Sequence, residues 1–270
     1  MAGIQVAVVG ASGRMGRQLV KVIQQADKHY QLCAALSHSQ SAALGIDSGV
    51  LASGRPNQIL VSADFAALST AAVVIDFALP EGLEQRLAAY VAAQCPALIC
   101  VTGLTAEDEQ ALQQAAKQIP LLYAANTSVG INLLAALTEQ AARVTGSSAD
   151  IEIFEAHHTR KQDAPSGTAL LLGAAAAAGR GVNLAEVAAY DRNGANQQHQ
   201  PGSIGFATIR AGDIVGEHTV YLVLGGERIE LTHRVADRST FAEGALRAAS
   251  WLAQGQKVGF YAMKHALGID

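Results

Sequence analysis

Short apolar runs that alternate with amphipathic segments constrain the fold of this chain more than any other feature of its sequence. Residues 4–9 read IQVAVV, a β-branched run that ends at the glycine-rich stretch GASGRMG, and the residues after it have apolar side chains at helical spacing. A second apolar run, YQLCAAL, occupies residues 30–36. A strand, a glycine turn, a helix and a second strand in this order are typical of a βαβ unit. We therefore predict a parallel sheet in the N-terminal part of the chain.

The same alternation continues as far as residue 126. The last helix of this region begins with a capping box formed by Thr105 and Asp108. Continuous apolar strands that alternate with amphipathic helices predict a parallel sheet covered on both faces, so we expect a Rossmann-like α/β domain. The further strands are predicted at residues 71–77, 97–101 and 120–126, and the helices at 80–94 and 105–118.

The pattern changes after Ser128. Gly225 and Gly226 separate two extended runs and are a hairpin signal. Strands joined by short turns predict a second domain of the α+β class, with a mixed or antiparallel sheet. Its strands are predicted at residues 149–158, 203–210, 217–224 and 227–235, its helices at 128–144 and 166–179, and a final helix at 240–254.

Charge and hydropathy exclude several classes of partner. The formal net charge of −4 gives no general attraction to nucleic acid or to anionic lipid. The longest apolar run, residues 170–178, is too short to span a bilayer, and no basic residue precedes Arg14 as the flank of a signal peptide would. We therefore expect a cytoplasmic protein with no nucleic-acid or membrane partner. Cys33, Cys95 and Cys100 form no CxxC pair and are expected to be buried free thiols.

The glycine turn after the first strand predicts a dinucleotide site. Gly10, Gly13 and Gly16 lie where a strand meets a helix, so the backbone can approach a pyrophosphate at the helix N-terminus. The spacing departs from GxGxxG because Ser12 stands at the position of the second glycine. A glycine-rich turn without a ligand is the alternative interpretation.

The end of the second strand bears on which cofactor is used. In NAD-binding domains an acidic residue about 20 positions beyond the glycines binds the ribose, but no Asp or Glu occurs between Asp27 and Asp47. Ser37 and His38 end the strand instead, and Arg14 lies in the turn. Because a hydroxyl, an imidazole and a guanidinium tolerate a 2′-phosphate, we expect NADPH to be used at least as well as NADH.

Residues 155–169, EAHHTRKQDAPSGTA, concentrate titratable side chains in a chain of which only 16% of residues are charged. His157 and His158 are adjacent at a strand end, so their side chains should point to opposite faces. Lys161 follows, and residues 165–168 open a helix whose first N–H groups have no intrahelical partner and can bind a carboxylate. We predict a carboxylate-bearing substrate beside a proton donor and no metal, with a solvated charged loop as the alternative.

These motifs resemble those of the dihydrodipicolinate reductase family. EAHHTRKQDAPSGTA is similar to the family's signature, and VAVVGASGRMGR, IDFALPEG, AANTSVGIN and GFATIRAGDIVGEH extend the likeness over nearly the whole chain. The resemblance implies an oxidoreductase that uses NADPH or NADH to reduce 4-hydroxy-tetrahydrodipicolinate, a small dicarboxylate, to tetrahydrodipicolinate in the diaminopimelate and lysine pathway.

The resemblance also implies roles for individual residues. His157 and Lys161 match the catalytic residues of the family, although the choice of proton donor between them stays open. The substrate would contact His158, Ser166, Gly167 and Thr168. In addition to Ser37 and His38, the expected cofactor contacts are Gly10, Ala11, Ser12, Gly13, Arg14, Met15, Cys100, Val101, Thr102, Ala124, Ala125, Asn126 and Thr127.

A third implication concerns domain organisation. In the family the C-terminal segment returns to the nucleotide domain, so we expect a dinucleotide-binding domain of residues 1–127 and 239–270. Residues 128–238 are expected to form a domain for substrate binding and oligomerisation. The family resemblance implies a homotetramer that assembles through the second sheet.

The chain departs from the family pattern at two places on the cofactor side. Cys100-Val101-Thr102-Gly103 stands where members commonly have Gly-Thr-Thr-Gly, and Ser37-His38 stands where they have an acidic and a basic residue. Cofactor preference therefore stays open. Two alternatives to the function also stay open: another amino-acid-pathway dehydrogenase, such as one for homoserine or aspartate, and a non-catalytic NADPH-binding sensor.

Overall fold

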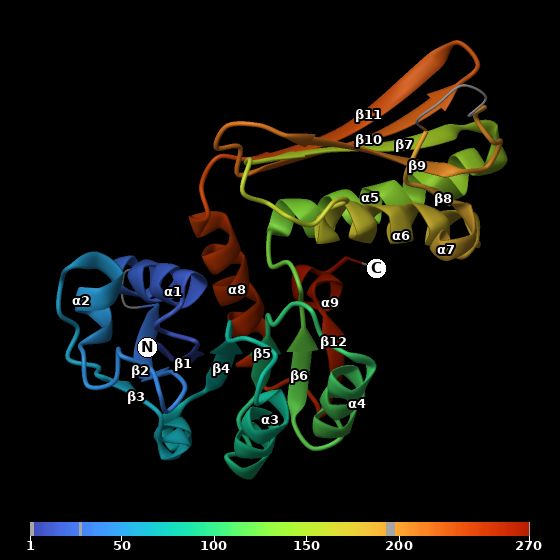
Figure 1. Ribbon diagram of the computed structural model, residues 1–270. Helices are drawn as coiled ribbons and strands as arrows, with labels where there is room; N and C mark the ends of the chain where they lie inside the picture. Colours follow the sequence, from blue (N-terminus) through green and yellow to red (C-terminus); the bar gives the residue numbers. More distant parts are fainter. Residues whose placement is uncertain (1–2, 27–28, 193–197, 270) are drawn as a thin grey trace. The chain divides into compact units, whose positions relative to one another are not determined.

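A computed structural model of the chain describes residues 3–26, 29–192 and 198–269. The chain divides into two compact units, which we call unit 1 and unit 2. Unit 1 consists of Met1–Ser128 and Ser239–Asp270, and unit 2 consists of Val129–Arg238. Unit 1 is therefore built from both ends of the sequence (Figure 1). Among the described residues, no helix combines the length and the apolar character needed to cross a membrane.

Unit 1 contains a seven-stranded sheet in the order β12-β6-β5-β4-β1-β2-β3. Every pair of neighbouring strands is parallel. The strands are β1 (Ile4–Val9), β2 (Tyr30–Leu36), β3 (Val61–Ser62), β4 (Val73–Asp76), β5 (Ala97–Ile99), β6 (Pro120–Tyr123) and β12 (Gly259–Ala262).

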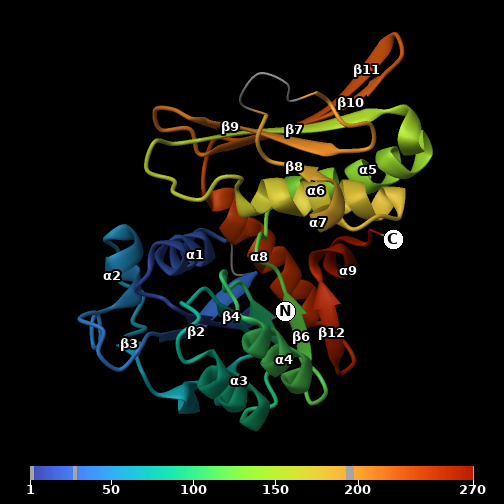
Figure 2. The same cartoon turned by 45° about the vertical axis from the view of Figure 1, so that its right-hand side comes forward.

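Helices cover both faces of this sheet, which is why its strands are apolar at consecutive positions. On β1, Val6 and Val8 belong to a buried cluster that includes residues of α1 and α8, whereas Ala7 and Val9 belong to a second cluster with residues of α3 and α4 (Figure 2). The helical segments are α1 (Arg14–Gln25), α2 (Ser48–Ser53), η1 (Phe65–Thr70), α3 (Leu83–Ala92), α4 (Ala106–Ala115), α8 (Ser239–Leu252) and α9 (Met263–Leu267).

The direction of the chain across the sheet reverses between β1 and β4. From β1 the chain proceeds through β2 to β3 at one edge, and then returns to β4 and proceeds through β5 and β6 in the opposite direction. In open parallel sheets, ligands bind beyond the carboxyl ends of the strands at such a switch point. The turn that follows β1 at this point is the glycine turn.

Unit 2 contains a five-stranded mixed sheet in the order β11-β10-β7-β9-β8. β10 pairs antiparallel with β7 and β11, whereas β9 pairs parallel with β7 and β8. Residues 225–226 join β10 to β11, as the hairpin signal predicts. The elements are α5 (Val129–Thr145), η2 (Gly146–Ser148), β7 (Asp150–His157), α6 (Gly167–Arg180), α7 (Leu184–Val187), β8 (Ala188–Ala189), β9 (Ile204–Arg210), β10 (Gly216–Leu224) and β11 (Glu227–Val235).

The two faces of this second sheet differ. The helices α5, α6 and α7 lie on one face (Figures 1 and 2), where Ile153 and Val220 are buried. No described helix lies on the other face, which we call the open face. There Phe154 is half-buried, while Ile209 and Val223 are 44% and 38% exposed.

The predicted Rossmann-like sheet and the second mixed sheet are confirmed, and so is the capping box of Thr105 and Asp108. The short elements between residues 48 and 70 were outside the prediction, as were β12 and α9. They have too few residues to show a hydrophobic period. The loop around α2 is instead organised by one side chain, because the Asp47 carboxylate accepts hydrogen bonds from four backbone N–H groups.

Candidate active site

The glycine turn joins β1 to α1 and requires glycine at two positions. Gly10 has a φ of 76°, and a Cβ at this position would lie 2.8 Å from backbone atoms of Phe77 and Ala78. A Cβ on Gly16 would lie 2.1 Å from the carbonyl oxygen of Gly10. The turn therefore brings β1, the start of α1 and the segment after β4 close together.

The N-terminus of α1 fits the pyrophosphate of a dinucleotide. Gly13 is the N-cap residue, no side chain caps the helix, and its first turn has no acidic residue. The first N–H groups of α1 therefore lack a side-chain acceptor, and the helix dipole favours an anion there. Arg14 is exposed and Met15 is half-buried beside this end, while the N–H of Ala11 donates to the carbonyl of Leu36 at 2.9 Å.

Hydroxyl groups occupy the place where NAD-specific domains carry an acid. The Oγ atoms of Ser12 and Ser37 are 2.7 Å apart, and the Ser41 hydroxyl donates to Ser12 Oγ at 3.4 Å. Ser37 is buried and His38 is exposed. Since no carboxylate lies in this cluster, it contains nothing that would repel a 2′-phosphate.

Three other cofactor candidates follow β5, at the same sheet edge as Gly10. Cys100 and Val101 are buried, so their backbone atoms are the groups that a ligand could reach, whereas Thr102 is exposed. Burial and the nearby Asp76 carboxylate raise the pKa of the Cys100 thiol well above its usual range. This cysteine is therefore a packing residue and not a nucleophile.

The segment after β6 supplies the last group of cofactor candidates. Ala124 is buried and Ala125 is exposed, and the side chain of Asn126 accepts the N–H of Ser128 at 2.9 Å. The hydroxyl of Thr127 is buried and donates to the carbonyl of Phe241 at 2.7 Å. The Thr127 side chain thus ties β6 to α8, inside unit 1.

In unit 2, β7 delivers His157 into a hydrogen-bonded network. His157 is 8% exposed, and its Nδ1 lies 2.5 Å from Oε2 of Glu155, two residues earlier on the same face of the strand. The rings of His157 and His218 meet edge to face, with centroids 5.1 Å apart. A Cβ on Gly216 would lie 3.2 Å from Nε2 of His157, so the absence of a side chain at 216 keeps that nitrogen clear.

Glu155 is the acceptor at the centre of this network. Its Oε2 accepts from Nη1 of Arg210 and its Oε1 from Nη2, both at 2.8 Å. Oε1 also accepts from the N–H of Ser166 at 3.1 Å and the hydroxyl of Thr208 at 3.2 Å. Burial alone would raise the pKa of the Glu155 carboxyl, but the hydrogen bonds and charges of His157 and Arg210 lower it to about 2. Glu155 is therefore a carboxylate at neutral pH.

His158 and Lys161 lie beyond the end of β7. His158 is half-buried with no described partner for its buried Nδ1, and burial together with the charge of Arg160 lowers the pKa of its imidazole. Nζ of Lys161 lies 2.8 Å from Oδ2 of Asp163. The N–H of Lys161 donates to the carbonyl of His158 at 3.1 Å, so the two candidates belong to one turn.

The first turn of α6 carries the remaining substrate candidates. Ser166 is the N-cap, its Oγ accepts the N–H of Ala169 at 3.1 Å, and the same Oγ lies 3.1 Å from Nε2 of His218. Because Ser166 is 1% exposed, its side chain serves the fold. Gly167 is exposed and a Cβ there would meet nothing within 4 Å, so open space adjoins the helix start; Thr168 is half-buried beside it.

Sequence reasoning missed three members of this network. Glu155, Arg210 and His218 carry no predicted role, although all three stand in the motifs EAHHTRKQDAPSGTA and GFATIRAGDIVGEH. The period of two along β7 could have placed Glu155 beside His157. Only the pairing of β7 with β9 and β10 brings Arg210 and His218 to them, because His157 pairs with Arg210 and Glu155 with His218.

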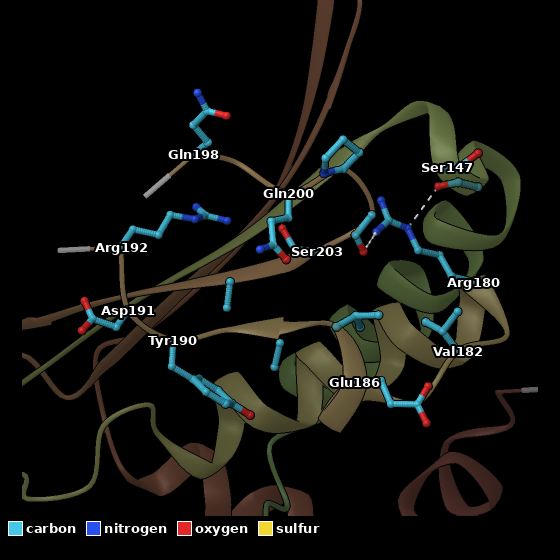
Figure 3. A pocket seen from close by; sticks show the side chains of 16 residues that line it. Ser147, Arg180, Val182, Glu186, Tyr190, Asp191, Arg192, Gln198, Gln200 and Ser203 are labelled. Atoms are coloured by element: carbon cyan, nitrogen blue, oxygen red, sulfur yellow. Dashed lines mark hydrogen bonds between the residues drawn. The ribbon is translucent and has the colours of Figure 1, made fainter. Parts of the chain in front are cut away.

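A cavity of about 700 Å³ lies elsewhere in unit 2, around α7, β8 and the loop before β9 (Figure 3). None of the predicted site residues lines it. The guanidinium of Arg180 at its wall donates to the carbonyls of Gly146, Ala149 and Gly202.

In the ranges that the structure describes, no group of three His, Cys, Asp or Glu side chains is placed to hold a metal ion.

Comparisons with known proteins agree over both units. Residues 4–127 match the family model for dihydrodipicolinate reductase, N-terminus, and residues 130–267 match dihydrodipicolinate reductase, C-terminus. A 4-hydroxy-tetrahydrodipicolinate reductase of Pseudoalteromonas atlantica is 46% identical over 266 residues, covering 98% of this chain and 99% of the relative. One of Halorhodospira halophila is 45% identical over 265 residues, covering 98% of each.

A solved structure shares the fold. The dipicolinate-bound dihydrodipicolinate reductase from Paenisporosarcina sp. TG-14 has a TM-score of 0.72 and 20% sequence identity. The match covers 96% of this chain and 97% of that one.

Proposed function

The chain belongs to the dihydrodipicolinate reductase family, and from this premise we propose which of its residues carry out the reduction. The protein is an NAD(P)H-dependent oxidoreductase that reduces 4-hydroxy-tetrahydrodipicolinate in the diaminopimelate and lysine pathway. Because the two family models together span residues 4–127 and 130–267, the alternatives of an unrelated amino-acid dehydrogenase and of a non-catalytic sensor are set aside.

Unit 1 binds the cofactor, which supplies the hydride when bound. The first N–H groups of α1 and the turn from Gly10 to Met15 hold the pyrophosphate. Ser37 and His38, with the exposed Arg14, surround the adenine ribose and accept a 2′-phosphate. The backbone of residues 100–102 and 124–127 lines the nicotinamide end, since the fold already uses the side chain of Thr127 and the buried Cys100.

Unit 2 binds the substrate, and one contact is made to a carboxylate of the substrate. The exposed start of α6 at Gly167 is the positive end of the helix dipole and would receive this anion, and Lys161 adds a positive charge. The N–H of Gly167 is hydrogen-bonded to the Asp163 carboxylate, so the substrate carboxylate would take the place of Asp163 there. Ser166 holds that turn in place through its cap and its bond to Glu155. His158, from the same turn as Lys161, contacts the substrate ring.

The reduction requires the 4-hydroxyl of the substrate to leave as water, a hydride that the bound cofactor would supply, and one proton. His157 donates this proton, which neutralises the carbanion left by hydride addition. Nδ1 of His157 is hydrogen-bonded to Glu155, so Nε2 is the ring nitrogen that faces the substrate. Lys161 stabilises the developing negative charge and orients the carboxylate. The single observation that carries these assignments is the hydrogen-bonded chain from His157 through Glu155 to Ser166 at the start of α6.

The test is a coupled assay in which a synthase makes the substrate from pyruvate and aspartate semialdehyde, while loss of reduced-nicotinamide absorbance is followed with NADPH and with NADH. We expect His157→Gln and Lys161→Ala each to lower kcat by about 10²- to 10⁴-fold, the range of general acid catalysis, with a cofactor Kd within about two-fold of wild type.

Two exposed residues of unit 1 give matched controls. His29→Gln and Lys117→Ala should leave kcat unchanged, since neither side chain belongs to the proposed site. Near-normal turnover in both His157→Gln and Lys161→Ala would contradict the catalytic assignments. A large preference of the wild type for NADH would contradict the role given to Ser37 and His38.

The protein works as a homotetramer in the cytoplasm, and the open face of the unit 2 sheet is the surface that assembles. Ile209 and Val223 are exposed there, and Phe154 is half-buried. Aliphatic side chains exposed on a sheet face without a helix over it are stabilised when a partner surface covers them. The same face carries ion pairs that would border such an interface, Glu217 with Arg234 and Arg228 with Glu230. Fractionation of cells should recover the protein with the cytoplasmic enzymes, and recovery with membranes would oppose this location.

A further inference from the structure

Glu155 is a buried carboxylate whose contacts enter the proposed function but whose own role in the reduction has not been assigned. It is 1% exposed, and it accepts hydrogen bonds from His157, from both terminal nitrogens of Arg210, and from groups of Ser166 and Thr208. A buried charge is costly unless it is paired and hydrogen-bonded. Here both carboxylate oxygens are satisfied from three directions, so Glu155 is fixed in position with its charge retained.

The contact with Glu155 decides which nitrogen of His157 is available for chemistry. A carboxylate can only accept, so Nδ1 of His157 must carry the hydrogen that lies between the two atoms, 2.5 Å apart. Among the described residues, Nε2 of His157 has no hydrogen-bond partner. It is also not one of the fully buried polar atoms, so it is accessible from outside the network. The clearance left by Gly216 lies at this same nitrogen.

Arg210 fixes Glu155 from the neighbouring strand. On β9, Arg210 pairs in register with His157 and Thr208 pairs with Glu155, so sheet register sets the whole arrangement. The guanidinium contacts each carboxylate oxygen with a different terminal nitrogen, a two-point geometry that restricts rotation of the carboxylate.

We propose that Glu155 and Arg210 are positioning residues for the reduction: Glu155 holds His157 in the Nδ1–H form and stabilises its imidazolium, and Arg210 holds Glu155. This proposal rests on the proposed role of His157 as proton donor. Neither residue touches the substrate in this scheme, because both act through His157.

The charges around His157 agree with this assignment. Glu155 on β7 is negative, Arg210 on β9 is positive, and the ammonium of Lys161 is offset by Asp163 at 2.8 Å. On β10, burial and the charge of His157 lower the pKa of the His218 imidazole to about 3, so His218 adds no charge at neutral pH. Burial also lowers the pKa of His233 on β11, and burial with Arg160 lowers that of the adjacent His158. Glu155 is thus the negative group in direct contact with His157.

The first test is the tautomer of His157 in the wild-type protein, read from the ¹⁵N NMR shifts of its ring at alkaline pH. We expect the hydrogen on Nδ1, although free imidazole side chains favour Nε2. A wild-type ring with its hydrogen on Nε2 would overturn the proposal, and this measurement requires no variant to fold and no enzymatic activity.

The second test compares Glu155→Gln, Glu155→Asp and the control Glu139→Gln. Glu139 forms an ion pair with Arg143 on α5 of the same unit and lies outside both the site and the open face. We expect Glu155→Gln to lower kcat about 10- to 100-fold and to move the alkaline limb of the kcat–pH profile to lower pH, because the charge that stabilises the imidazolium is gone. Glu155→Asp keeps the charge and should keep the position of that limb, while Glu139→Gln should change neither quantity.

A Glu155→Gln enzyme whose alkaline limb stays in place would overturn the proposal even if its kcat fell, since lost packing lowers kcat without moving the limb. If the wild type showed no reductase activity, the proposed function would fail, whereas the tautomer measurement would still decide the role of Glu155. Should Glu155→Gln fail to fold, the wild-type tautomer and the Glu155→Asp profile decide the outcome.

Discussion

At the scale of single residues, the burial of His218 makes the stability of unit 2 depend on pH. It is 3% exposed, its Nε2 contacts Ser166 Oγ at 3.1 Å, and its pKa is lowered from 6.5 to about 3 by burial and by the charge of His157. A histidine whose pKa is depressed by folding binds its proton more readily in the unfolded chain. Its contribution to stability is complete above pH 6.5 and is lost as the pH falls toward 3. We predict that acidification from pH 7.5 to 5 costs unit 2 about 2 kcal/mol through this residue.

The measurement is the free energy of opening of the β7 and β10 amides by hydrogen exchange, in the wild type and in His218→Gln. The difference in opening free energy between the two proteins at pH 7.5 is the control. At this pH His218 is neutral, so the difference reports only the loss of packing caused by the substitution. The wild type should lose about 2 kcal/mol more than the variant between the two pH values. Equal losses would show that His218 carries none of this pH dependence. The carboxyl of Glu155, with a pKa of about 2, stays ionised throughout the interval.

At the scale of elements, the connection between β4 and α3 depends on one buried ion pair. Asp76 at the end of β4 is fully buried, and its Oδ2 accepts from Nε of Arg86 at 2.8 Å. The terminal nitrogens of Arg86 donate to the carbonyls of Leu79 and Glu81, so the segment that touches Gly10 is held by the same side chain. We predict that Arg86→Leu destabilises unit 1 by about 3 to 5 kcal/mol, because the buried Asp76 charge loses its counter-charge and is left with the hydrogen bonds from Tyr90 and Ala78.

Unit 1 offers its own probe for this prediction. Trp251, the single tryptophan of the chain, lies in α8 and packs against the unit 1 core, so its fluorescence during urea unfolding reports on this unit. The exposed Arg55→Leu serves as the matched control and should change stability by less than about 0.5 kcal/mol. Equal midpoints for Arg86→Leu and Arg55→Leu would show that the ion pair does not stabilise the loop. Cofactor affinity should fall with Arg86→Leu as the support of the Gly10 turn loosens.

What the sequence predicts at this scale depends on whether a signal is periodic. Strands such as residues 4–9 and helices such as residues 105–118 have a period or a cap that one segment shows by itself, so they are found to within a few residues. The dense motif likewise places His157, His158 and Lys161 within one short segment of the chain. Arg210 and His218 join them only through strand pairing, and sequence alone carries no register between strands so far apart.

At the scale of the whole molecule, we expect the open face of the unit 2 sheet to form the interface between subunits. The proposed tetramer would bury Ile209 and Val223, which are 44% and 38% exposed in the single chain. We predict a tetramer for the wild type by sedimentation velocity, and smaller species for Ile209→Glu and Val223→Lys, because each variant would replace a buried aliphatic side chain of the interface by a charge without a partner. Val144→Lys is the matched control: Val144 is 81% exposed on α5, which lies on the helical side of the same sheet, and its substitution should leave the tetramer intact. Circular dichroism must match the wild type in all three variants, so that a change in mass reflects assembly and not unfolding. A wild-type monomer, or a tetramer that survives both open-face charges, would place the assembly surface elsewhere.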